Sequence, residues 1–183
     1  MYLCTHLHLG GKSAMQERPN FSNTAGTRAC KLTLGELLLH ALVIEREAVH
    51  RYSELAGMMA QVGNKKVARI FSKMSGIEAQ HAEYIEAQIK DRKLPVLTPS
   101  QFTWPGPEAP ENTDSHRLFH FMTPRQALEL ALDNERRAYE FYNDVVDDST
   151  DERVREMAAD FAVEEEQHIA WVEKWLADEQ SSE

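Results

Sequence analysis

A repeat of two amphipathic segments limits the possible folds of this chain more than any other feature. Residues 41–52 align with residues 131–142, with Glu, Ala and Tyr at matching positions, and residues 67–85 align with residues 154–172. In all four segments apolar side chains recur three and four residues apart, which is the spacing of a helix with one buried face. The sequence therefore predicts an all-α fold that contains the same helical hairpin twice.

Capping residues and helix breakers give the expected limits of the helices. Thr33 and Glu36 have the spacing of a capping box, in which each side chain accepts a hydrogen bond from the other residue's backbone N–H group. Thr123, followed by Pro124 at the first helical position, marks a second sharp start, and Gly63 interrupts the pattern between the first two helices. We expect helices over residues 34–61, 67–89 and about 124–146, and a fourth from the turn at 147–151 to about residue 178.

A proline-rich segment separates the two predicted hairpins. Residues 92–122 contain prolines at positions 95, 99, 105, 107 and 110, which are too many for a helix, and the segment is too long for a tight turn. We expect a crossover strap that joins two antiparallel hairpins into one four-helix bundle. The predicted organisation is a flexible N-terminal tail over residues 1–30 and a single bundle domain over residues 31–180.

Each predicted helix carries a glutamate in the middle of its apolar stripe. In two of the helices a histidine follows three residues later, on the same face. Counted from the turn of each hairpin, these side chains fall at one level of the bundle. The candidate residues are Glu45, Glu78, His81, Glu135, Glu165 and His168.

Four carboxylates in an apolar seam need a compensating positive charge, because desolvation and mutual repulsion both oppose their ionisation. No Lys or Arg falls on the stripes near that level, whereas two divalent cations would balance the four charges and accept both imidazoles as ligands. A Glu-x-x-His motif on each of two helices, with a Glu from each of the others, is typical of di-metal carboxylate bundles. Nitrogen and oxygen ligands without thiolate suit iron or manganese. The expected cofactor is two iron ions, with Mn or Zn as possible substitutes. The alternative is a solvated acidic face or a bundle that binds no metal stably.

These residues resemble the ferritin-like superfamily, and most closely its rubrerythrin-type diiron branch, over about residues 33–176. The resemblance rests on the Glu-to-Tyr spacing in residues 45–52 and 135–142 and on the motifs that end at His81 and His168. It implies that Glu78 and Glu165 bridge both irons. It also implies that Glu45 and Glu135 are terminal ligands and that each histidine binds one iron.

The same resemblance gives a role to two tyrosines. Tyr52 and Tyr142 would donate hydrogen bonds to ligand carboxylates, with ordinary packing in an aromatic core as the alternative. Two features depart from typical rubrerythrins. This sequence has two cysteines and no four-cysteine rubredoxin-like module, so we expect electrons from an external donor or from Fe(II) itself. Ala138 replaces a further glutamate, so we expect no redox-linked exchange of ligands.

The activity implied by the resemblance is that of a diiron oxidoreductase. Such a protein would oxidise Fe(II) with O2 or hydrogen peroxide, as a ferroxidase or a peroxide scavenger. A non-catalytic iron-binding or iron-storage protein is the alternative, and a structural bundle with a vestigial site is a third possibility.

Charge and cysteine content indicate the compartment and the partners. The net charge of −10 argues against binding to nucleic acid or to an anionic membrane. Two cysteines suit a reducing cytoplasm, and the short apolar run at residues 3–9 resembles neither a signal peptide nor a membrane span. We expect a cytoplasmic protein that forms a homodimer or a larger homo-oligomer. Four aromatic residues of the strap could pack against a second subunit or, alternatively, against the chain's own bundle. They are Phe102, Trp104, Phe119 and Phe121.

Overall fold

The computed structural model describes residues 32–98, 101–102 and 122–180. Within them the chain forms four helices: α1 (Leu34–Gln61), α2 (Lys65–Ile89), α3 (Pro124–Asp148) and α4 (Glu152–Gln180). The predicted tail, residues 1–30, and most of the predicted strap at 92–122 lie outside the described residues. None of the four helices is long and apolar enough to cross a membrane.

Local side-chain hydrogen bonds explain where the helices begin. At the start of α1 the Thr33 hydroxyl accepts from the Glu36 backbone N–H at 3.3 Å, and Glu36 accepts from the Thr33 N–H at 2.8 Å. Thr123 and Gln126 make the same reciprocal pair before α3. Asn64 accepts from a backbone N–H of the first turn of α2. Because Asn64 caps the helix, α2 begins at Lys65, two residues before the start at residue 67 that the apolar pattern indicated.

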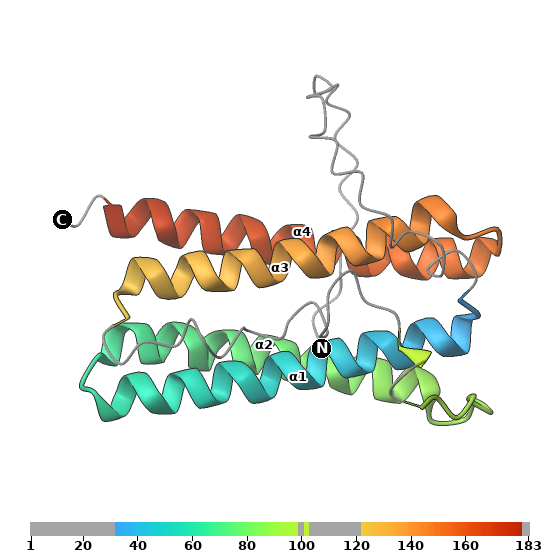
Figure 1. Ribbon diagram of the computed structural model, residues 1–183, viewed down its shortest axis with the longest axis horizontal. Helices are drawn as coiled ribbons and strands as arrows, with labels where there is room; N and C mark the ends of the chain where they lie inside the picture. The colour runs from blue at the N-terminus through green and yellow to red at the C-terminus, as the bar shows by residue number, and fades with distance from the viewer. Residues whose placement is uncertain (1–31, 99–100, 103–121, 181–183) are drawn as a thin grey trace, which may run out of the picture.

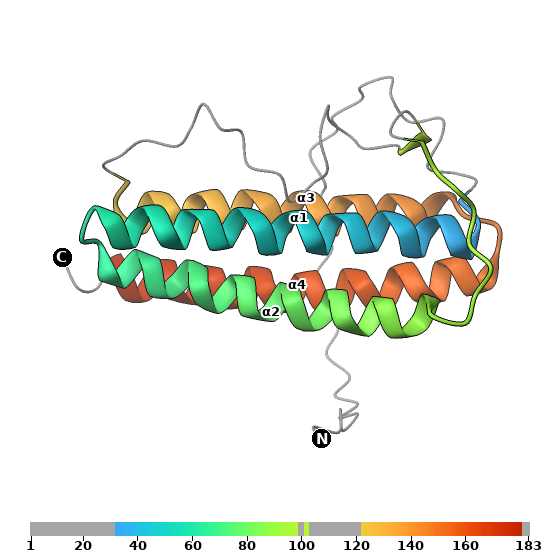
Figure 2. The ribbon, with the colours of Figure 1, turned by 90° about the horizontal axis from the view of Figure 1, so that it is seen from below.

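The two hairpins lie against each other as a four-helix bundle. Figure 1 shows α1 and α2 antiparallel in one layer and α3 and α4 antiparallel in the other. Seen from below, α1 overlies α3 and α2 overlies α4 in the view (Figure 2), and the helices of the two hairpins that approach most closely are α1 with α4 and α2 with α3. Because α2 and α3 run in the same direction, their connection has to span the length of the bundle, as expected for a crossover. The predicted all-α bundle of two hairpins is confirmed.

Two apolar clusters fill the interior, and the candidate carboxylates lie between them. One cluster holds Ile44 and the other holds Ala48, which flank Glu45 on α1. On the other three helices the same change of cluster occurs around the glutamate, between Met74 and Ala82, between Leu132 and Ala138, and between Ala162 and Val172. The charged level is therefore closed off by packed side chains at both ends.

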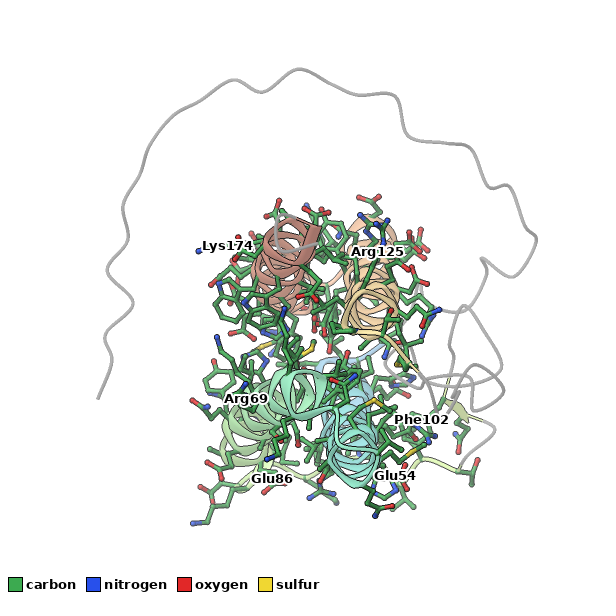
Figure 3. All side chains as sticks on the ribbon, turned by 90° about the vertical axis from the view of Figure 1, so that its left-hand side faces the viewer. Glu54, Arg69, Glu86, Phe102, Arg125 and Lys174 are labelled. Carbon is green, nitrogen blue, oxygen red and sulfur yellow. The ribbon has the colours of Figure 1, made fainter. Side chains whose placement is uncertain are left out.

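One strap residue packs on the chain's own bundle. The ring of Phe102 lies 4.9 Å from the ring of the fully buried His40 on α1, and Figure 3 shows Phe102 beside the first hairpin. This contact favours the intramolecular alternative for Phe102. The other strap aromatics, Trp104, Phe119 and Phe121, lie outside the described residues, so dimerisation stays a prediction.

We expect Thr123→Ala to lower the free energy of unfolding by about 1 kcal/mol, because it removes the acceptor of the first-turn N–H group of α3. Chemical denaturation followed by circular dichroism measures this loss. The control is Thr150→Ala in the turn before α4, where the side chain is exposed and the expected change is below about 0.5 kcal/mol. Equal losses in both variants would contradict the capping role.

Candidate metal centre

All six candidate residues lie at one level of the bundle, on the inward faces of their helices. Their separations from the hairpin turns place them there, and their helices hold them with little freedom. None of the four glutamates is more than 2% exposed, and His168 is 3% exposed. His81 differs, because its side chain keeps 21% of its surface exposed. The structure thus brings together the residues that the sequence singled out.

One imidazole nitrogen faces carboxylates from three helices. His168 Nδ1 on α4 lies 3.0 Å from Glu135 Oε2, 3.4 Å from Glu165 Oε2 and 3.5 Å from Glu78 Oε1. These helices belong to both hairpins. The arrangement concentrates negative charge around a single nitrogen in a nearly dry environment.

Glu78 connects the two halves of the centre. Its Oε1 atom faces His168, and its Oε2 atom lies 3.6 Å from His81 Nδ1. The two histidine rings stack with their centroids 4.9 Å apart and their planes at 10°. Glu45 Oε2 lies 3.9 Å from His81 Nδ1 on the side of the first hairpin.

Among the described residues, two sets of three ligand atoms lie within metal-binding reach. In each set, donor atoms from all three residues fall within 4.8 Å of one another. The sets are Glu78, His81 and His168, and Glu135, Glu165 and His168. His168 belongs to both sets, whereas the resemblance implied one iron for each histidine, and Glu45 belongs to neither. The assignment of individual ligands to individual ions therefore stays a prediction.

Unsatisfied polar atoms in the centre fit a bound cation. His81 Nδ1 is buried and makes no hydrogen bond with a described residue, and the contact of Glu165 Oε2, which is also buried, is with His168 Nδ1 at 3.4 Å. Buried polar atoms almost always have a partner, since leaving one unsatisfied costs about 1–3 kcal/mol. A carboxylate oxygen and an imidazole nitrogen are both ligand atoms for Fe, Mn or Zn, so a divalent ion at this level would satisfy both.

The pKa values respond to burial and crowding. Burial raises the pKa of Glu165 to about 7, and burial together with the Glu135 and Glu45 carboxylates raises the pKa of Glu78 well above its usual range. Burial lowers the pKa of His81 to about 4, with help from repulsion by His168. Burial also acts to lower the pKa of His168, but the hydrogen bond to Glu135 and the surrounding carboxylates outweigh it and raise that pKa to about 11. Without metal, protons therefore supply part of the missing positive charge.

Tyr52 makes the contact that the resemblance implied. Its hydroxyl donates to Glu135 Oε1 at 2.9 Å, from α1 in one hairpin to α3 in the other. Tyr142 is just as fully buried, and its ring lies against Phe141 and Phe161. The predicted hydrogen bond from Tyr142 to a ligand carboxylate stays a prediction.

Sequence reasoning missed three residues around the centre. Asn134 is fully buried and donates to the Tyr52 hydroxyl at 3.4 Å, and Arg137 donates to the Asn134 side-chain oxygen. Trp171 stacks on His168 with 5.4 Å between ring centroids, while 42% of Trp171 is exposed. A comparison of the two repeats could have drawn attention to the first two, because Ile44 corresponds to Asn134 and Glu47 corresponds to Arg137.

Comparisons with known proteins found a family and a solved structure that the chain resembles. The family model described as Rubrerythrin matches residues 36–176. The solved structure of an uncharacterized conserved protein from Magnetospirillum magnetotacticum is 35% identical to the chain, with a TM-score of 0.66, and the match covers 80% of this chain and 95% of that one. No curated protein matches the chain.

We expect the metal-free protein to lose the contribution of Glu165 to its stability as the pH rises from about 4.5 to 7, and that of His168 as the pH rises from about 6.5 to 11. Glu165 and His168 have raised pKa values in the folded chain. Their contributions to stability are complete below the unfolded pKa of each group and are lost as the pH rises through the folded value. His81, whose pKa is lowered, changes stability only below about pH 6.5. The midpoint of thermal unfolding, measured at several pH values after chelation, tests this expectation.

Added Mn(II) should raise the unfolding temperature more at pH 8.5 than at pH 6.5, because fewer protons then compete for the ligands.

Glu165→Gln should flatten the pH dependence of the metal-free protein between about pH 5 and 7, where Glu165 titrates. The matched control is Glu166→Gln at the exposed neighbouring position. Identical pH profiles for both variants and the wild type would contradict the account of Glu165.

Proposed function

The chain belongs to the rubrerythrin family of ferritin-like proteins, and from this membership we propose that it is a diiron oxidoreductase that oxidises Fe(II) with O2 or hydrogen peroxide. One observation carries the proposal. Two overlapping sets of carboxylate and imidazole ligands share His168 in a seam that packed apolar side chains close at both ends. A pair of iron ions is the cofactor that suits this donor set.

Glu78 would hold both ions, since its two oxygens face different histidines, at 3.5 Å and 3.6 Å. The family resemblance gives Glu165 the same role, and Glu45 and Glu135, one from each hairpin, would each hold one ion.

The chain prepares the centre for iron and keeps it dry. Bound ferrous ions supply the electrons that reduce O2 or peroxide. Tyr52 holds Glu135 Oε1 by a hydrogen bond, which leaves Oε2 directed at the His168 side of the site. His168 Nδ1 holds a proton among the carboxylates in the absence of metal, and that proton has to leave before the nitrogen binds an ion. The apolar clusters on either side exclude water and strengthen the electrostatic interactions at this level.

His81 marks the proposed approach to the centre. Its side chain is 21% exposed, whereas the side chain of His168 is 4% exposed. Oxidant and incoming Fe(II) would therefore enter beside α2. An external donor or Fe(II) itself would provide the electrons, and the chain would act as a homodimer or a larger oligomer.

Glu78→Ala should slow the oxidation of added Fe(II) by at least about tenfold, since loss of even an outer partner of a metal ligand typically costs 10–100-fold. The reaction is started with O2 and, separately, with hydrogen peroxide under anaerobic conditions, and ferric iron is followed by its absorption. Comparison of the two rates identifies the preferred oxidant.

The matched control is Glu83→Ala, which removes an exposed carboxylate from the same helix and should leave the rate unchanged. Equal rates for wild type and Glu78→Ala would exclude catalysis at this centre. Iron analysis after loading distinguishes the storage alternative. About two ions per chain are expected for a diiron centre, and a large excess would favour storage.

A further inference from the structure

We propose that Asn134 and Arg137 are positioning residues that fix the direction of the Tyr52 hydrogen bond and so make the metal position of the second hairpin fill before that of the first. The second-hairpin position is the one formed by Glu135, Glu165 and His168. The inference rests on the proposed diiron function, because it assigns unequal affinities to the two ions of that centre.

Three hydrogen bonds connect a partly exposed arginine to a buried ligand carboxylate. Arg137 Nη2 donates to Asn134 Oδ1 at 2.5 Å, Asn134 Nδ2 donates to Tyr52 Oη at 3.4 Å, and Tyr52 donates to Glu135 Oε1 at 2.9 Å. Asn134, Tyr52 and Glu135 are all fully buried. A hydrogen bond in such surroundings is stronger than the same bond in water, and breaking it leaves a buried polar group without a partner.

The chemistry of the donors fixes the direction of the whole chain. A guanidinium group has only donors, so the atom of Asn134 that faces Arg137 has to be the amide oxygen. The amide nitrogen then faces Tyr52, and the tyrosine oxygen accepts from it. The single hydroxyl proton of Tyr52 is thereby directed to Glu135. Arg137 thus acts on the Glu135 carboxylate through two other side chains, those of Asn134 and Tyr52.

The first hairpin cannot form the equivalent chain. In the repeat, Ile44 stands at the position of Asn134, and its side chain can neither donate nor accept a hydrogen bond. Glu47 stands at the position of Arg137 and carries the opposite charge. The two hairpins therefore place the same ligand types on the same helix positions but support them differently.

This difference predicts unequal metal positions. Glu135 has one oxygen fixed by Tyr52 and the other 3.0 Å from His168 Nδ1, so the side chains need little reorganisation when an ion replaces the proton that His168 Nδ1 holds. In the first hairpin, His81 Nδ1 lies 3.6 Å and 3.9 Å from its carboxylate neighbours, and the His81 side chain is partly exposed. A fixed ligand set loses less entropy on binding and should be occupied first.

Anaerobic titration with Co(II) alone tests the proposal, with isothermal calorimetry for affinity and tryptophan fluorescence for binding at the centre. Trp171 stacks on His168, which belongs to both ligand sets, so an ion in either position should quench its fluorescence. In the wild type we expect two resolved steps, and the substitutions that follow assign each step to a position. Trp171→Phe identifies the signal, because it should remove the quenching without removing the two steps.

Asn134→Leu should weaken the first step by about tenfold or more, which is the usual effect of removing an outer partner of a ligand, and leave the second step unchanged. Arg137→Met should have a smaller effect in the same direction, and Arg137→Lys should restore most of it, because lysine keeps a donor and a charge. The matched control is Arg136→Met, which breaks only a surface ion pair with Glu173.

Tyr52→Phe tests whether Asn134 acts on the metal position through Tyr52. If Asn134 acts through Tyr52, Asn134→Leu in the Tyr52→Phe background should cause no further loss, since the two substitutions break the same chain. Equal affinities of the two positions in the wild type would overturn the proposal. So would wild-type binding by both Asn134→Leu and Arg137→Met. Two-step Co(II) binding without Fe(II) oxidation would instead overturn the proposed activity and leave this inference intact.

Discussion

Four carboxylates enclosed between two apolar clusters are the constraint on which the rest of the structure depends. None of them is more than 2% exposed, so their charges cannot be screened by water and have to be balanced at close range. The pKa values show the need for this balance. The raised pKa values of Glu78 and Glu165 favour their neutral forms, and the raised pKa of His168 favours its positively charged form. Metal ions and protons therefore compete for the same carboxylate and imidazole side chains.

The fold was largely predictable because its determinants are local or periodic. The capping boxes at Thr33 and Thr123 use residues three positions apart, so both helix starts were predicted correctly. The inward stripes repeat every three or four residues, and packing preserved them. The limits of α2, α3 and α4 differ by about two residues from those expected, because the apolar pattern does not show how far a cap or a fraying end extends a helix.

The details of the centre were less accessible to sequence reasoning because they depend on contacts between helices. Spacing placed six side chains at one level, but it does not determine which carboxylate oxygen faces which nitrogen. The two ligand sets share His168 and leave Glu45 aside, which is set by side-chain rotamers. The stacking of Trp171 on His168 was missed for a different reason. Trp171 lies on the same face one turn later but is 42% exposed, so the stripe did not include it.

Duplication explains the site, and divergence between the copies explains its asymmetry. A helical hairpin with one Glu and one Glu-x-x-His motif brings three ligands to the seam, and a second copy completes the centre without further change of the backbone. Two copies that place ligands at the same helix positions do not have to bind metal with the same affinity. The pair Asn134 and Arg137 differs from Ile44 and Glu47 in hydrogen bonding and in charge, and the difference acts through Tyr52, which comes from the other hairpin. The support of each metal position can therefore change while the ligands themselves stay the same.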